Sequence, residues 1–105
     1  MAQRFIQIGS AKAKATVAAA QYRPGQPLDD LIEVARLRRS YGRAEAVEVP
    51  EWRCLLVRMM DEDGDKVDYL VVEDGGWLAH DSLGLHLHTH SGTEFAMLFR
   101  PEQGG

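Results

Sequence analysis

The spacing of apolar residues at the start of the chain predicts a strand, followed by a segment that fits either a helix or a strand. Residues 4–8 are apolar and β-branched in character and end at Gly9, which predicts a strand. Across residues 11–22, small apolar side chains recur at helical spacing until the turn signal at 24–25. The alternation over residues 12–17 suits a strand equally, so both helix and strand remain open for this segment.

Residues 27–41 predict the clearest helix of the chain. Aspartates lie in its first turn, arginines lie in its last turns, and Gly42 follows directly. These charges complement the helix dipole at both ends, and the glycine suits a left-handed cap. The helix has a broad apolar face, for which a sheet is the expected partner. Its basic face is expected to stay exposed and to contact an acidic protein surface or phosphate through Arg36, Arg39 and Arg43.

After the helix, the pattern is one of short strands separated by turns. Asp63-Gly64 predicts a hairpin, and a strand with two apolar faces, over 53–60, is typical of the centre of a sheet. The whole chain, 1–105, is therefore predicted to be one α+β domain. One or two helices pack on an antiparallel, curved five- to six-stranded sheet or a partly closed barrel. The predicted meander comprises residues 44–49, 53–60, 67–73, 77–80, 85–90 and 94–100.

Length and composition place the chain among ordinary globular domains. It has 105 residues, of which 45% are hydrophobic and 27% charged, enough for one core. No apolar stretch is long enough to cross a bilayer, and the first residues lack the apolar core of a secretory signal. The single cysteine, Cys54, excludes an intrachain disulfide and lies among apolar neighbours. We therefore expect a cytoplasmic protein with a buried, unreactive thiol.

The charge pattern favours a protein partner. The net charge of −4 argues against nucleic acid as the main partner, because phosphate binding depends on basic patches. Basic residues gather over 36–43 and acidic residues over 61–74, which predicts a charge dipole and oriented association with a partner or with a second copy. A short sheet also leaves edges that need cover, which favours a homo-oligomer.

Three of the four histidines alternate along one predicted strand. His86, His88 and His90 are therefore expected on one face, with the intervening leucine facing the core. Neighbouring histidines lie ~6.8 Å apart along the strand, close enough to share an ion, whereas three span roughly 14 Å. A metal would therefore take a pair. Glu94 joins the histidine face if residues 91–93 form a three-residue loop, and faces the opposite way if the loop has two residues.

The stretch from His88 to Glu94 resembles the H-x-H-x3-E core of the first metal motif of the cupins, which are small double-sheet β-barrels. The resemblance implies that His88, His90 and Glu94 bind iron, manganese, zinc or nickel. Apart from the resemblance, the positions of His86 on the same strand and of His80 on the preceding one make them candidates for a further ligand. The second, downstream cupin motif has no counterpart in this sequence. Residues 87–91 also resemble the start of the polymerase-and-histidinol-phosphatase phosphoesterase motif, and 88–90 the histidine pair of the JAB metalloproteases.

Two classes of function fit these patterns. The first is a small interaction or regulatory module, such as an inhibitor or accessory factor, that acts through its charge asymmetry and an exposed sheet or helix face. We favour this class because no catalytic set is recognisable, and we expect no cofactor. The second is a cupin-like protein that binds a divalent metal, or a minimal metal-dependent enzyme, built on His88, His90 and Glu94.

Overall fold

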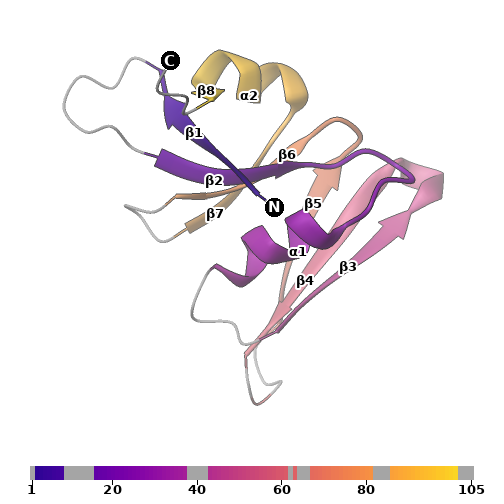
Figure 1. Ribbon diagram of the computed structural model, residues 1–105. Coiled ribbons are helices and arrows are strands. Elements are labelled where there is room, and N and C mark those ends of the chain that lie inside the picture. Colours follow the sequence, from indigo (N-terminus) through magenta and orange to yellow (C-terminus); the bar gives the residue numbers. More distant parts are fainter. Residues whose placement is uncertain are drawn as a thin grey trace.

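The computed structural model describes residues 2–8, 16–37, 43–61, 63, 67–81 and 86–101 (Figure 1). Within these ranges the chain forms two α-helices, a short 3-10 helix and eight strands. Their bounds are β1 Gln3–Gln7, β2 Thr16–Gln21, α1 Asp29–Arg36, β3 Arg43–Val49, η1 Pro50–Trp52, β4 Cys54–Met60, β5 Val67–Glu73, β6 Trp77–Asp81, β7 His86–His90, α2 Gly92–Leu98 and β8 Phe99–Pro101.

The strands form two antiparallel sheets. Five strands pair in the order β7-β6-β2-β1-β8, and three pair in the order β3-β4-β5. The α+β class and the antiparallel pairing are thus confirmed, and the sheets are open and curved rather than closed into a barrel. β4 is the central strand of its sheet, as its two apolar faces predict. The order departs from a simple meander, because β2 pairs with β6 across a long stretch of chain.

One prediction of secondary structure is wrong, one open alternative is settled, and a third element is shorter than predicted. Residues Thr16–Gln21 form a strand, so the helical alternative fails there; residues 9–15 lie outside the described part. The strand predicted over 94–100 is mostly the helix α2, because the Ser91 hydroxyl accepts a hydrogen bond from the Glu94 amide at 3.1 Å and caps a helical turn. The first helix spans Asp29–Arg36, and residues 38–42 are not described.

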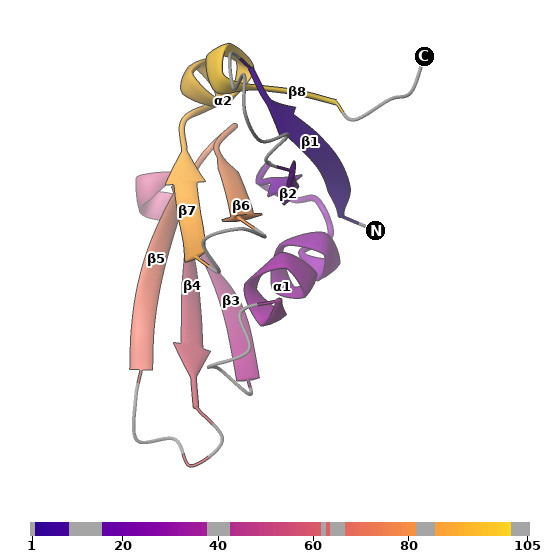
Figure 2. The same cartoon turned by 90° about the vertical axis from the view of Figure 1, so that its left-hand side faces the viewer.

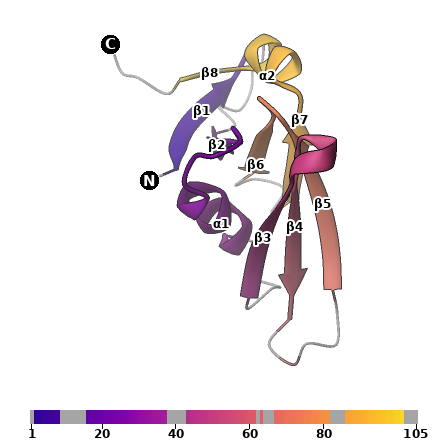
Figure 3. The same ribbon diagram turned by 90° about the vertical axis from the view of Figure 1, so that its right-hand side faces the viewer.

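The main core lies between the two sheets, with α1 joining them. Figures 2 and 3 show α1 beside β2 of one sheet and β3 of the other. Val34 and Ala35 of the helix are fully buried against Leu55 and Val57 of β4 and Leu78 of β6. The apolar face predicted for this helix therefore contacts both sheets, which fixes the angle between them. Within the described residues, no helix is long and apolar enough to cross a membrane.

A second, aromatic cluster covers the other face of the five-stranded sheet. Phe95 of α2 stacks on Trp77 of β6, with ring centroids 4.2 Å apart and planes within 8°. Phe5 of β1 meets both rings edge to face. Phe99 packs beside Phe95. Helix α2 is short, so this cluster supplies most of the contacts that hold it on the sheet.

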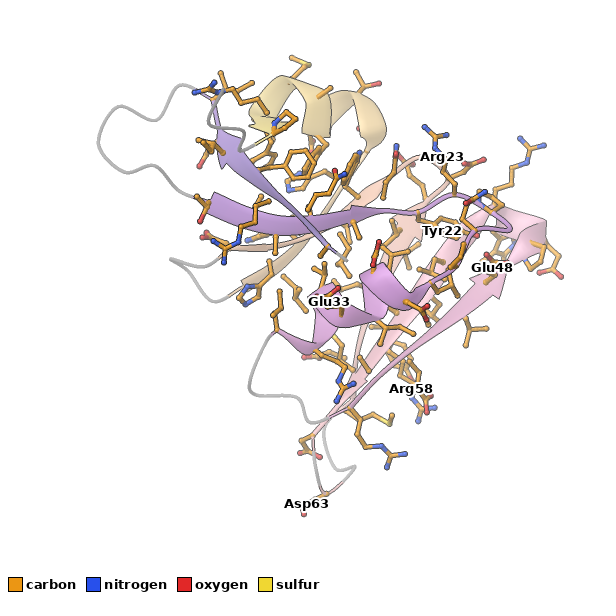
Figure 4. The ribbon with its side chains drawn as sticks, in the orientation of Figure 1. Tyr22, Arg23, Glu33, Glu48, Arg58 and Asp63 are labelled. Carbon is orange, nitrogen blue, oxygen red and sulfur yellow. The ribbon has the colours of Figure 1, made fainter. Side chains whose placement is uncertain are left out.

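A buried tyrosine ties the turn after β2 to the three-stranded sheet. The Tyr22 hydroxyl donates a hydrogen bond to the Glu48 carboxylate on β3, and the Gly25 amide donates to the same carboxylate at 3.3 Å. Figure 4 shows Tyr22 and Glu48 close together at this junction. Burial, followed by the negative charge of Glu48, raises the pKa of Tyr22 above its usual value of 10.0. The contact therefore depends on a protonated phenol.

Candidate functional site

The pairing of β6 with β7 fixes where the histidines lie. His90 pairs with Trp77, His88 with Ala79 and His86 with Asp81, so these positions belong to the sheet face that α2 covers. His80 pairs with Leu87 instead, and it is buried on the opposite face, toward the main core. The suggestion that His80 supplements the histidine site is therefore wrong. Alternation along β6 places it on the other side of the sheet.

His90 and Glu94 form a close pair at the end of β7. The Nδ1 of His90 lies 2.6 Å from Oε1 of Glu94. Neither predicted loop produces this contact, since the helix begins at Gly92 and brings Glu94 back over His90 four residues later. Toward a carboxylate, Nδ1 acts as the donor, which fixes the tautomer and the ring orientation. The pair that the sequence suggested does form, through a helical turn rather than across a hairpin.

Two glycines allow the backbone segments around this pair to approach closely. A Cβ on Gly76 would lie 3.0 Å from the carbonyl oxygen of His90, and a Cβ on Gly92 would lie 2.8 Å from that of Gly75. The turn between β5 and β6 thus packs directly on the start of α2. A side chain at either glycine would force the turn and the start of α2 to shift apart.

The surroundings of the pair are partly aromatic and partly open. The His90 ring lies 5.6 Å from Phe99 and 6.1 Å from Phe95, between ring centroids, and its side chain is largely covered. Glu94 is exposed and borders an open depression that also touches β5; its lining residues are Val71, Glu73, Thr89, His90, Ser91 and Glu94. Water therefore reaches the carboxylate more easily than the imidazole.

The predicted metal ligands come together only in part. The exposed His88 ring has its centroid 6.3 Å from that of His90. Among the side chains that the structure describes, no three histidine, cysteine, aspartate or glutamate groups converge on a common point. The side chain of His86 is outside the description. The described site is thus a His90–Glu94 pair with His88 beside it.

The basic residues proposed for partner binding do not form one described patch. Arg36 is exposed at the end of α1, Arg43 is exposed at the start of β3, and Arg39 lies outside the described residues. By register, Arg43 pairs with Met60 and belongs to the face of the three-stranded sheet that points away from the main core.

That outward face carries a surface that the sequence did not single out. Two rows of side chains cross the three strands on this face. One row holds an acidic, a basic and an aromatic residue, and the other holds three aliphatic residues. Val47, Tyr69 and Val71 are each 56% exposed. Figure 4 shows Arg58 projecting from the side of this sheet opposite α1. We call this surface the outer patch; its rows are Glu45–Arg58–Tyr69 and Val47–Leu56–Val71.

An exposed tryptophan lies at one end of the outer patch. Trp52, in the 3-10 turn between β3 and β4, is 79% exposed. The next residue, Arg53, has a φ of 49°, a left-handed conformation that returns the chain directly into β4. The sequence did carry a signal for this surface, because both faces of β4 are apolar while the core covers only one of them.

Comparison with protein-family models, curated proteins and solved structures found no match to this chain.

Proposed function

We propose that the protein is a small cytoplasmic interaction or regulatory module that binds a protein through the outer patch. One observation carries the proposal: Val47 and Val71 are more than half exposed and flank Leu56 in a continuous apolar row. Exposed apolar residues are ordinary when scattered, but a contiguous group rimmed by polar side chains marks an interaction surface.

The composition of the outer patch supports this function. Its centre is aliphatic, and its neighbouring row offers Tyr69 and Arg58, two residue types enriched where binding energy concentrates. Arg58 lies on the central strand β4, and Tyr69 lies on β5, which pairs with β4 along its whole length. The surface is consequently ordered before binding, which lowers the entropy cost of association.

Hydroxyl-radical footprinting in intact cells tests whether a partner covers the outer patch. Tyr69 is the probe and Met97, 73% exposed on α2, is the matched control within the same molecule. We expect Tyr69 to react severalfold more slowly, relative to Met97, in intact cells than in dilute purified protein. An unchanged ratio means that no partner covers the patch.

The second candidate function is divalent-metal binding by His88 and His90, with Glu94 in support. The 2.6 Å contact between His90 and Glu94 favours it, because metal-binding histidines commonly donate their other ring N–H to a carboxylate. In this arrangement Glu94 orients His90, and the histidines supply the nitrogen ligands that suit zinc or nickel.

Thermal unfolding with added metal tests the second candidate. Zinc or nickel in excess should raise the Tm of metal-free protein by stabilising the folded state, and His88→Ala should remove that rise. His80→Ala is a poor control because His80 is buried, so the control is Thr93→Ala, on the exposed start of α2. No shift at excess metal, or a shift that survives His88→Ala, contradicts metal binding here.

A further inference from the structure

We propose that the partner on the outer patch is a second copy of this chain, so that two three-stranded sheets pack face to face. This inference rests on the proposed function and names its partner. Face-to-face sheets pack about 10 Å apart with interleaved side chains, a geometry that an aliphatic row on an open sheet can adopt. A two-fold dimer presents the same surface from both sides, so the outer patch must complement itself.

The charges on this side of the sheet meet that requirement. By register, the outward positions of β3, β4 and β5 include two arginines and two glutamates, whose formal charges cancel: Arg43, Glu45, Arg58 and Glu73. The chain as a whole carries −4, so the surplus negative charge lies elsewhere. Two copies that meet through other surfaces repel on average, whereas two copies that meet here do not.

The rows also place unlike charges side by side. Glu45 pairs directly with Arg58, and Tyr69 follows in the same row. An arginine positioned between a carboxylate and a phenol can reach across a sheet interface while its aliphatic stem covers the neighbouring apolar row. Arg58 is therefore the residue through which the charge balance of the outer patch is best tested.

The size of the surface predicts a weak dimer. Strands of seven residues extend about 24 Å and three strands span about 14 Å, using ~3.4 Å per residue and ~4.8 Å between strands. That plan area of about 340 Å² per copy falls below the ~800 Å² per partner typical of stable complexes. We therefore expect reversible, concentration-dependent association rather than an obligate dimer.

Sedimentation equilibrium across a wide concentration range measures this association. Wild-type protein should move from monomer to dimer as concentration rises. Val71→Asp places a charge in the apolar row twice per dimer, and should weaken dimerisation about tenfold or more, equivalent to about 1.4 kcal/mol. Met97→Asp introduces the same charge at an exposed apolar residue on α2 and should leave dimerisation unchanged.

A pair of charge reversals tests whether two copies meet through this same surface. Arg58→Glu changes the sum of the four outward charges to −2, and Glu45→Arg changes it to +2. Each variant alone should dimerise less than wild type, and the two mixed together should associate more tightly than either alone. Circular dichroism and urea unfolding establish that both variants fold.

Three results would overturn the proposal. They are a wild-type chain that stays monomeric at high concentration, a dimer that survives Val71→Asp, and charge variants that do not prefer each other. Footprinting separates this failure from failure of the proposed function. If Tyr69 is protected in cells but not in concentrated purified protein, the outer patch binds a different protein. If it is protected in neither, the proposed function itself is wrong.

Discussion

Phe95→Ala is expected to lower the free energy of unfolding by about 3–5 kcal/mol, the usual cost of removing a buried phenylalanine side chain. Phe95 is buried between Phe5, Trp77 and Phe99, and it is the buried residue through which α2 holds to the five-stranded sheet. Its loss leaves a cavity that Trp77 and Phe99 can fill only in part. Urea unfolding followed by circular dichroism measures the change.

The matched control is Met97→Ala on the same helix. Met97 is largely exposed, so its truncation should change stability by no more than about 0.5 kcal/mol. Equal effects from the two substitutions would mean that α2 is not anchored by the aromatic cluster. Phe95→Ala should also separate His90 from Glu94, which shows as changed chemical shifts of the His90 ring signals by NMR.

Tyr22→Phe is expected to cost about 1.5–3 kcal/mol near neutral pH, the typical value of a hydrogen bond to a charged group. The substitution keeps the ring in the core but removes the hydroxyl that donates to Glu48. It leaves the carboxylate bonded to the Gly25 amide at 3.3 Å. The turn after β2 should then separate more readily from β3.

The contribution of Tyr22 should fade at alkaline pH. Burial first, and then the charge of Glu48, raise the pKa of Tyr22 in the folded protein above the value of 10.0 that applies to the unfolded chain. Above pH 10 the unfolded chain releases the phenolic proton while the folded protein retains it, so stability falls as pH rises toward the folded pKa. Below pH 10 the contribution of Tyr22 to stability is complete.

Urea midpoints of wild type and Tyr22→Phe at about pH 8 and about pH 11 measure this dependence, because the two proteins differ only in the titrating hydroxyl. The difference between them should shrink at the higher pH. Tyr69→Phe, at an exposed tyrosine, should show no such trend. A constant difference for Tyr22→Phe across the range would rule out a buried, proton-dependent contact.

Much of the fold was predictable because its elements carry local signals. The charges at both ends of α1 and the alternation in β3, β5 and β7 led to the correct elements. The strand prediction over 94–100 failed because the apolar residues there also suit a strand, whereas the Ser91 hydroxyl accepts from the Glu94 amide and so starts a helix. Thr16–Gln21 stayed open because alanine-rich sequences fit both periodicities, and only pairing with β1 and β6 decides.

The candidate sites were less accessible to sequence reasoning. The sequence analysis predicted that a hairpin brings His90 and Glu94 together, whereas in the structure a helical turn does so. Which side of the sheet His80 occupies depended on the register with β7. The outer patch is exposed because α1 and the five-stranded sheet pack on the opposite face of the three-stranded sheet. This arrangement depends on tertiary packing, which the local sequence pattern does not specify. The two apolar faces of β4 correctly predicted a central strand, but they did not reveal that the main core packs on the face of Leu55, Val57 and Met59.

The most direct measurement of the central claim is the oxidation rate of Tyr69 relative to that of Met97, compared between intact cells and dilute purified protein. A partner on the outer patch predicts a severalfold lower ratio in cells, because Tyr69 lies in the patch and Met97 lies on α2. The same ratio in both settings would contradict the claim that this face binds a protein.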